Sequence, residues 1–482
     1  MNNNMFDLVM VGSGFASTFF LKKYLQKVPA DTKVLVLERG YFTSHKDRLK
    51  ARREETGEEK PDTKDKNENY KKTFINNTPD KHWIFTTGFG GSSNCWFACT
   101  PRFLPNDFKL KSLYGVGTDW PITYDQLSAY YDEVEEIMSV SGPQETPFPK
   151  ERLYPQPPHT FTEVDKILKK NYGNLYINQP TARSRVPGSG RNACCANSVC
   201  STCPSNAKFT IENSNMGVYE DERVEINYGA QVTELEFVND TVRSVVFIKD
   251  GKEENVRSEV FALGANSIFN AHILLNSGDK NSLVGKGLGE QIGIQATVLL
   301  DNLQNVGGST WVNANGYMLY DGEHRKDSAA CLMESSNFPF VRMERGKWRN
   351  MASFRMIFED LPEEKNSVQL TKDRLIPQVS HFGPSSYTLR GIERMKQKLP
   401  EILSCLPVED IHYQNPFNSE AHILGTTRMS NDAQNGVVDK NLIHHNYRNL
   451  FVLGGSSFNT FTPANPTLTI SALSLYTADK NF

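Results

Sequence analysis

The chain has 482 residues, enough for one large domain or two of ordinary size, and its 38% hydrophobic and 23% charged residues are typical of a soluble globular protein. A formal net charge of −3 argues against a nucleic-acid partner or an anionic membrane surface. No apolar run is long enough to span a membrane, and no secretory signal precedes the first predicted strand, so we expect a cytoplasmic protein.

The N-terminal region carries a dinucleotide-binding fingerprint. Residues 6–11 form the continuous apolar run of a buried parallel strand, Gly12-Ser13-Gly14-Phe15-Ala16-Ser17 follows, and a second apolar strand at residues 33–37 ends at Glu38. The two glycines let backbone N–H groups approach a pyrophosphate at a helix N-terminus, and the acidic residue accepts a hydrogen bond from a ribose hydroxyl. Ser17 replaces the usual third glycine. The fingerprint does not distinguish FAD from NAD.

The composition changes abruptly after the second strand. From Ser44 to about Lys72 the chain is rich in Lys, Arg, Glu and Asp and nearly free of apolar residues. We interpret residues 44–80 as a solvated, charged surface excursion or flap, because such a segment cannot bury an apolar face. A surface that docks a partner is the alternative.

A glycine-rich loop, Gly88-Phe89-Gly90-Gly91-Ser92-Ser93-Asn94-Cys95-Trp96, comes next. Its small residues would let the backbone lie against a flat ligand such as the isoalloxazine ring of a flavin. The alternative is an ordinary glycine-rich loop without a ligand.

The chain has eight cysteines, and half of them lie in one short segment: Cys194, Cys195, Cys200 and Cys203. This crowding does not resemble a disulfide framework, which agrees with a reducing compartment. The thiols are candidate ligands of zinc or of an iron–sulfur cluster, and Pro204 after the last cysteine is seen in ferredoxin-type ligation. No distant pair of Cys or His residues completes a tetrahedral zinc site, so free or redox-paired thiols remain the alternative.

Strands with alternating polarity are predicted at residues 224–228, 231–235 and 243–248, and Lys249-Asp250-Gly251-Lys252 predicts a hairpin turn. Residues 260–265, Val-Phe-Ala-Leu-Gly-Ala, predict a return to the nucleotide-binding sheet. Residues 300–420 predict a second sheet with helices.

The C-terminal sixty residues contain three short motifs. His422 precedes Ile-Leu-Gly-Thr-Thr-Arg-Met, residues 449–456 are an apolar run that ends in Gly454-Gly455-Ser456, and Asn465-Pro466-Thr467 predicts the start of a helix with Pro466 at its first position. A His and an Asn therefore bracket a buried strand, an arrangement that suits a base and a hydrogen-bonding group aimed at one ligand.

These motifs resemble the C-terminal signature of the glucose-methanol-choline (GMC) flavin oxidoreductases, and the resemblance covers nearly the whole chain except residues 44–80 and 305–350. It implies FAD as cofactor, with His422 and Asn465 facing the flavin where the substrate alcohol is oxidised. Residues 305–350 include Phe338, Phe340, Arg342, Arg345 and Trp348. They are candidates to wall the active site or dock an electron acceptor, and a surface loop with anchoring aromatic residues is the alternative.

The resemblance also implies a set of cofactor-binding residues from most of the chain. In the family, a Gly-Ala pair closes on the nucleotide and a strand backbone lies near adenine; the alternative for Val232 is ordinary strand core. The full set is Gly12, Ser13, Gly14, Phe15, Ala16, Ser17, Glu38, Arg39, Gly90, Gly91, Ser92, Asn94, Cys95, Trp96, Val232, Gly264, Ala265, Gly454, Gly455, Pro466 and Thr467.

Two departures from the family pattern concern cysteines. Pyranose-oxidase-like members bond flavin covalently to a His at the position of Cys95, so we expect non-covalent FAD here. The segment around Cys194 resembles the segment of bacterial FAD-dependent glucose and fructose dehydrogenases that binds a three-iron cluster. The candidate ligands in this chain are Cys194, Cys200 and Cys203. Here the last spacing is one residue shorter, which favours the absence of a cluster because its ligands must converge on fixed metal positions.

We therefore predict an α/β flavoprotein with a Rossmann-like FAD-binding domain (1–43, 81–100, 205–300 and 421–482) interleaved with a substrate domain built on a mainly antiparallel sheet with helices (101–204 and 301–420). The predicted reaction oxidises a CH–OH group of a sugar, polyol or related alcohol, with hydride transfer to flavin N5 and His422 as base. The alternatives are a redox-silent flavin lyase and an electron-transfer subunit of a larger complex. The acceptor is oxygen, a quinone or a protein, and the oligomeric state is left open.

Overall fold

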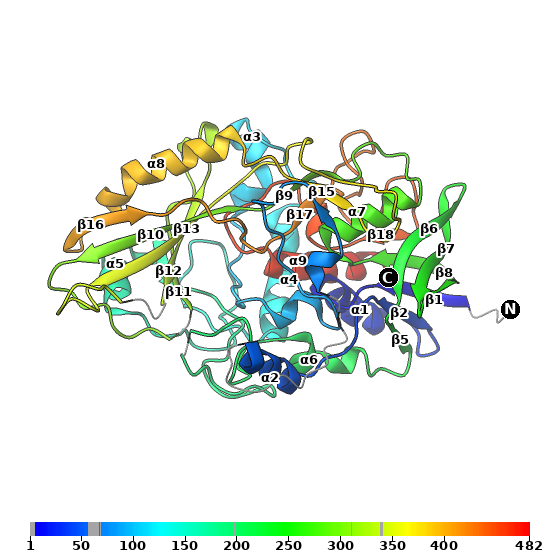
Figure 1. Ribbon diagram of the computed structural model, residues 1–482, viewed down its shortest axis with the longest axis horizontal. Coiled ribbons are helices and arrows are strands. Elements are labelled where there is room, and N and C mark those ends of the chain that lie inside the picture. Colours follow the sequence, from blue (N-terminus) through cyan, green and yellow to red (C-terminus); the bar gives the residue numbers. More distant parts are fainter. Residues whose placement is uncertain (1–4, 56–66, 68, 197, 310, 338–340) are drawn as a thin grey trace.

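The computed structural model describes residues 5–482 except 56–66, 68, 197, 310 and 338–340. Figure 1 shows the first of its sheets at the right, around β1 and β8, and a second sheet at the left, around β10–β13. Helices α4, α7 and α9 and a smaller third sheet lie between them. Residues of both larger sheets line the candidate site, which lies between them.

The first sheet orders its strands β5-β2-β1-β8-β7-β6, and β18 also pairs with β8. Its parallel part consists of β1 (Met5–Val11), β2 (Val34–Glu38), β5 (Val224–Tyr228) and β18 (Leu450–Val452) beside the inner half of β8 (Lys252–Leu263). An antiparallel meander of β6 (Gln231–Val238), β7 (Thr241–Lys249) and the outer half of β8 extends it. Asp250 and Gly251 have φ values of 51° and 74° between β7 and β8, which confirms the predicted hairpin.

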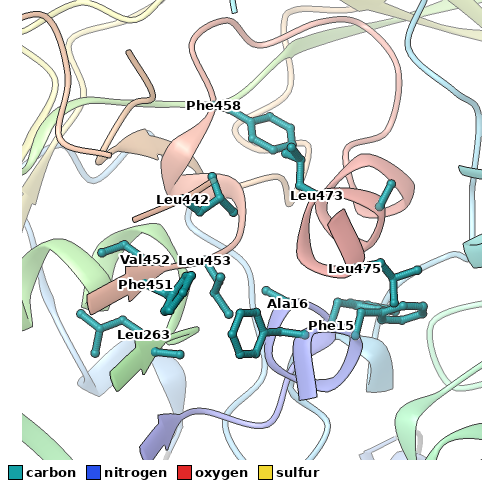
Figure 2. Packing of buried hydrophobic residues seen from close by; sticks show 14 of the residues in the cluster. Phe15, Ala16, Leu263, Leu442, Phe451, Val452, Leu453, Phe458, Leu473 and Leu475 are labelled. Atoms are coloured by element: carbon teal, nitrogen blue, oxygen red, sulfur yellow. The ribbon is translucent and has the colours of Figure 1, made fainter. Parts of the chain in front are cut away.

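Three helices form the core beside this sheet: α1 (Phe15–Lys27), α4 (Tyr124–Ile137) and α9 (Thr467–Asn481). Helix α9 contacts both others, and α1 follows β1 directly. Figure 2 shows side chains of α1, β8, β18 and α9 packed together, including Phe15, Leu263, Phe451 and Leu473. Helix α9 starts at Thr467, with Pro466 as its cap, one residue later than the sequence predicts.

Every described strand pair of the second sheet is antiparallel, and the strand order is β16-β10-β13-β12-β11-β4. The strands are β4 (Tyr176–Asn178), β10 (Ile292–Leu300), β11 (Val312–Leu319), β12 (Cys331–Ser336), β13 (Met351–Phe358) and β16 (Val408–Tyr413). Helices α5 (Glu163–Tyr172) and α8 (Ser386–Ile402) share a hydrophobic cluster with it.

Alternation along these strands separates an apolar face from a polar one. On β13, Ala352, Phe354, Met356 and Phe358 belong to the cluster with α5 and α8, so Arg355 points to the opposite face. On β12, Cys331 and Met333 belong to that cluster. Consequently every second residue of the two strands is free to face the middle of the molecule.

The third sheet joins β17 (Leu424–Thr426), β9 (Lys286–Gly289), β14 (Ser367–Gln369), β15 (Gln378–Ser380) and β3 (Ile75–Asn76) in that order. The shorter or peripheral helices are α2 (His45–Glu55), α3 (Leu110–Tyr114), α6 (Ile211–Ser214) and α7 (Asn266–Asn276). Single 3₁₀ turns are η1 (Tyr70–Lys72), η2 (Gly91–Asn94), η3 (Pro105–Lys109), η4 (Gly173–Leu175), η5 (Met216–Val218), η6 (Glu323–Lys326) and η7 (Gly455–Ser457).

The charged excursion is partly structured. Helix α2 occupies its start, and Arg48 of α2 forms an ion pair with Glu212 of α6, whose other carboxylate oxygen accepts the His45 backbone N–H at 2.9 Å. Residues 56–66 and 68 of the excursion lie outside the described residues. Among the described helices, none is long and apolar enough to cross a membrane.

The division into two interleaved domains stays a prediction. The parallel sheet contains strands from the segments assigned to the FAD-binding domain. Three strands from those segments lie elsewhere: β10 pairs with β13 and β16 in the second sheet, and β9 and β17 belong to the third sheet, where β9 pairs with β14.

Candidate active site

One cavity of about 750 Å³ runs from the carboxyl ends of β1 and β2 to the polar face of the second sheet. The parallel strands of an open α/β sheet end at one edge, which is where ligands of such sheets bind. Most residues predicted to touch the cofactor line this cavity: Gly12, Ser13, Gly14, Phe15, Ala16, Glu38, Arg39, Gly91, Ser92, Cys95, Trp96, Val232, Gly264, Ala265, Gly454, Gly455, Pro466 and Thr467. His422 and Asn465 line the same cavity.

The turn after β1 has the geometry that the fingerprint predicts. Gly12 has φ +89°, and a Cβ there would lie 2.8 Å from the carbonyl oxygen of Gly264. No atom lies within 4 Å of a Cβ built on Gly14, so the backbone at the start of α1 borders open space. Both oxygens of Glu38 are anchored at the end of β2, because Ser13 Oγ donates to one at 2.6 Å and Gly40 N–H donates to the other at 2.9 Å.

Three of the predicted cofactor-binding residues, Ser17, Gly90 and Asn94, do not line the cavity. Ser17 is fully buried, and its Oγ lies 3.5 Å from the carbonyl oxygen of Val11. Gly90 N–H donates to Ser13 Oγ at 3.1 Å, and Asn94 Nδ2 donates to the Phe89 carbonyl at 2.9 Å. These contacts hold the glycine-rich loop against the fingerprint turn, which is a supporting role.

A buried lysine, Lys208, holds the loop that carries Cys95 through hydrogen bonds to its backbone. Lys208 Nζ donates to the carbonyl oxygens of Asn94 and Trp96, each at 3.0 Å, and to that of Ser201 at 2.6 Å. Burial lowers the pKa of Lys208 to about 8. Burial raises the pKa of the Cys95 thiol, whose Sγ lies 3.9 Å from Thr86 Oγ1. Lys208 thus ties the cavity loop to the cysteine-rich segment.

The cysteine-rich segment does not gather its thiols into one set of ligands. Cys200 Sγ accepts a hydrogen bond from buried Arg183 at 2.8 Å, Cys194 Sγ lies 3.4 Å from the Ser309 carbonyl, and Cys203 Sγ lies 3.5 Å from Ser205 Oγ. Outside the gaps at 1–4, 56–66, 68, 197, 310 and 338–340, no group of three or more His, Cys, Asp or Glu side chains is arranged to hold a metal ion. The proposed cluster ligands remain a hypothesis from the sequence alone.

His422 is held at two points next to β17. Its backbone N–H donates to Glu290 Oε2 at 3.0 Å, and its ring Nδ1 lies 3.1 Å from Gln291 Oε1. Gln291 Nε2 donates to the carbonyl oxygens of Thr462 and Ala464 at 2.8 and 3.2 Å, so its amide oxygen must face the ring. The Nδ1 atom therefore carries the proton, and Nε2 is the unprotonated nitrogen.

The electrostatic surroundings keep His422 neutral. Burial and then the positive charge of Arg355 lower its pKa to about 3. Glu290 is fully buried and forms an ion pair with Lys81, which compensates the carboxylate that accepts the His422 backbone N–H. A neutral imidazole with a free Nε2 is the form that accepts a proton.

Asn465 lies directly after the segment that Gln291 binds. Its side chain is 8% exposed, and its Oδ1 has no hydrogen-bond partner among the described residues. A buried amide oxygen without a partner is costly unless a ligand or water satisfies it. Gln291 thus links the two residues that the sequence singled out, one through its ring and the other through the preceding backbone.

Sequence reasoning missed the polar groups that the second sheet adds to the cavity. Arg355 of β13 lies opposite Glu334 of β12 in the register, and both line the cavity. Arg355 binds Glu420 through Nη2 at 2.6 Å and Nε at 3.1 Å. A Cβ on Gly293 would lie 1.7 Å from Glu420 Oε1, so only glycine leaves room for this pair. The sequence signal that could have found these groups is a charged residue, Glu334 or Arg355, inside each of two otherwise apolar strands.

Glu334 has the most perturbed carboxyl group of the cavity. It is 4% exposed, and its Oε1 has no hydrogen-bond partner among the described residues. Its pKa is raised to about 8, first by burial and then by Glu420, against the lowering effects of Arg355, Arg183 and a hydrogen bond with Asn465. Perturbed groups of this kind gather at functional sites.

Comparison with known proteins agrees with this geometry. Residues 395–474 match the family model described as GMC oxidoreductase. The fructose dehydrogenase large subunit of Gluconobacter japonicus is 29% identical, over 81% of this chain and 80% of the relative. The 2-methyl-1,2-propanediol dehydrogenase of Mycolicibacterium austroafricanum is 25% identical, over 98% and 94%. Residues 395–474 thus carry the C-terminal domain of the GMC oxidoreductases.

The fold of the whole chain agrees with that of a solved structure. The crystal structure of pyridoxine 4-oxidase from Mesorbium loti superimposes with a TM-score of 0.67 at 16% sequence identity, covering 99% of each chain. At that identity the likeness shows the fold alone, and it is the α/β fold that the sequence predicts.

GMC oxidoreductases bind FAD, and the residues that line this cavity fit that cofactor. Open space lies before Gly14 at the N-terminus of α1, which suits a pyrophosphate, and the anchored Glu38 carboxylate at the end of β2 suits a ribose. The unpartnered Oδ1 of Asn465 borders the other end of the same cavity.

Proposed function

We propose that this protein oxidises a CH–OH group of a sugar, polyol or related alcohol with His422 as the base. The observation that carries the proposal is the orientation of His422. Gln291 accepts from Nδ1, so the unprotonated Nε2 remains on a residue that lines the cavity together with the nucleotide cradle. The family assignment agrees with this reaction, and the relatives include a dehydrogenase of fructose and one of a diol by name.

Two side chains of the protein act on the substrate hydroxyl: one accepts its proton and the other hydrogen-bonds its oxygen. His422 Nε2 takes the hydroxyl proton as the substrate C–H bond is cleaved and a carbonyl forms. Asn465, which lines the same cavity, donates a hydrogen bond from Nδ2 to the substrate oxygen and fixes its orientation. FAD, when bound, supplies the acceptor for the hydride that leaves the substrate carbon.

FAD would be held without a covalent bond. The fingerprint turn with Glu38, the loop that Lys208 supports, and Gly454-Gly455 supply the contacts from three distant parts of the chain. The residue at the family's covalent position is Cys95, not His. Burial raises the pKa of this thiol, which disfavours the thiolate needed for a bond to flavin.

The proposal is tested by anaerobic bleaching of the flavin absorbance with a panel of sugars, polyols and simple alcohols. Wild-type protein should bleach with at least one member, and His422→Ala should bleach far more slowly while retaining FAD. His412→Ala is the control, because His412 is exposed on β16 and lies outside the cavity. Full retention of FAD with no bleaching by any member would support a redox-silent lyase instead.

The electron acceptor is addressed by two further measurements. One relative is named a large subunit, which favours a dehydrogenase that works with partner subunits. Reoxidation of the reduced flavin by oxygen, by a quinone and by a cytochrome would be compared directly. Iron analysis of anaerobically purified protein decides the role of Cys194, Cys200 and Cys203, because about three irons per chain would establish the cluster that the shortened spacing disfavours.

A further inference from the structure

The polar face of β12 supplies an unassigned binding group to the cavity. Glu334 and Ser336 both line the cavity, and they are two residues apart on one strand, so their side chains point to the same side. Glu334 is nine-tenths buried or more, and its Oε1 lacks a hydrogen-bond partner within the described part of the chain. A buried carboxyl oxygen in this state is costly unless a ligand group or water satisfies it.

The position of Glu334 relates it to the reacting oxygen. The hydrogen bond between Glu334 and Asn465 places the carboxyl beside the amide that is proposed to hold the substrate oxygen. A substrate oxygen held by Asn465 therefore lies close to Glu334, and a group on a nearby substrate carbon can reach Glu334 Oε1. A hydroxyl on the neighbouring carbon has this relation to the reacting CH–OH.

The charges around Glu334 select against anions. Arg355 is the nearest cation across the register, but both of its donor atoms toward Glu420 are engaged, and its guanidinium lies 3.4 Å from the centre of the Phe417 ring. Arg355 is thus engaged by Glu420 and by the Phe417 ring. A carboxylate or phosphate ligand at this wall would have to compete with Glu420 for the guanidinium.

Aromatic side chains also contribute to the cavity wall. Trp311 and Phe417 line the cavity near the polar stripe, and the Trp311 ring centre lies 5.1 Å from that of Phe97. Sites of this composition bury the apolar C–H surface of a ligand and fix its orientation with a few polar groups. This arrangement suits a polyol, which presents C–H surface and hydroxyls on alternate sides.

We propose that Glu334 determines specificity by hydrogen-bonding a hydroxyl on the carbon next to the one oxidised, so that the substrate is an uncharged vicinal diol or sugar. The raised pKa of Glu334 supports this, because a protonated carboxyl both donates to and accepts from a hydroxyl. The inference rests on the proposed function.

Two matched sets of probes vary the group on the neighbouring carbon. One is propane-1,2-diol, propan-1-ol and 2-aminopropan-1-ol; the other is D-glucose, 2-deoxy-D-glucose and D-glucosamine. Their dissociation constants are measured by calorimetry in FAD-loaded His422→Ala protein, which is expected to bind substrate without oxidising it appreciably. In at least one set the hydroxyl compound should bind roughly tenfold or more tightly than its deoxy analogue.

Substitutions at Glu334 should abolish this preference. When Glu334→Leu is added to His422→Ala, the dissociation constants of the hydroxyl compound and its deoxy analogue should lie within about twofold of each other. Glu334→Gln should retain a preference of several fold, because an amide still hydrogen-bonds a hydroxyl. Glu359→Gln is the matched control: Glu359 is a fully buried carboxylate paired with Arg325 outside the cavity, so its loss should lower the unfolding temperature and leave the preference intact.

The outcomes separate this inference from the proposed function. An unchanged preference in Glu334→Leu, no preference in either set, or tighter binding of the ammonium compounds than of the diols would overturn the role of Glu334. Flavin reduction in His422→Ala at the wild-type rate would instead refute the proposed base, whatever the dissociation constants show.

Discussion

Gln291→Leu isolates the contribution of the residue that orients the base. The substitution removes the 3.1 Å contact to His422 Nδ1 and both hydrogen bonds from Nε2, leaving the carbonyl oxygens of Thr462 and Ala464 buried without that donor. A hydrogen bond contributes about 0.5–1.5 kcal/mol net, and each buried unpaired group costs about 1–3 kcal/mol. We expect the free energy of unfolding to fall by about 2–5 kcal/mol.

The effect on the reaction follows from the proton on the imidazole. Without an acceptor at Nδ1, the proton can move to Nε2, and the ring loses both its tautomer and its fixed orientation. The ring becomes charged as it takes the proton, and a hydrogen bond to a charged group contributes about 1.5–3 kcal/mol. Because about 1.4 kcal/mol corresponds to a factor of ten, loss of this bond should slow anaerobic flavin reduction by about tenfold to a hundredfold. Stopped-flow absorbance at saturating substrate measures that rate directly.

Two further variants distinguish positioning from general destabilisation. Gln295→Leu removes a buried amide of β10 that donates to Ser353 of β13. Gln295 does not line the cavity, so this variant should destabilise the fold without slowing flavin reduction. Gln291→Glu places a carboxylate beside Nδ1, which favours the imidazolium and raises the pKa of His422. Its reduction rate should therefore fall as the pH is lowered. A folded Gln291→Leu protein that reduces flavin within twofold of the wild-type rate would refute the orientation argument.

Four other predictions concern the same cavity. His422→Ala should slow flavin reduction by about a hundredfold or more, and Asn465→Ala should cost less, with FAD retained by both in absorbance spectra. Because the His422 pKa is about 3, the base stays unprotonated down to about pH 5, so the wild-type reduction rate should show no acidic decline between pH 8 and pH 5; a half-maximal point near pH 6.5 would contradict this. Acid denaturation should release free FAD, and flavin that precipitates with the protein would indicate a bond to Cys95. Gly293→Ala should displace Glu420 and lower the free energy of unfolding by about 1–3 kcal/mol, read as a lower Tm.

Local patterns made the nucleotide end of the site predictable. The glycine turn, the helix start and Glu38 are set by about thirty consecutive residues, and backbone sterics alone require Gly12. His422 and Asn465 were found through the family wording around them. Each is flanked by residues whose spacing is fixed by one short strand and one turn.

The substrate end could not be predicted in the same way. Arg355 and Glu334 become neighbours only through the register between β12 and β13, and Glu420 reaches them from a loop 65 residues beyond Arg355. Gln291 likewise acts through contacts to residues more than 130 positions away. Such pairings depend on tertiary packing, and a polar residue inside an apolar strand indicates only that something must satisfy it.

The packing between Ser17 and Gly264 constrains how the two positions can change during evolution. A methyl group on Gly264 would lie 2.1 Å from Ser17 Oγ but 3.4 Å from Ser17 Cβ, so an alanine there requires the hydroxyl to be lost first. The order of the two substitutions follows: Ser17→Ala or Ser17→Gly opens the space, and Gly264→Ala then fills it. Related chains that carry alanine or glycine at the first position are the ones in which alanine should appear at the second.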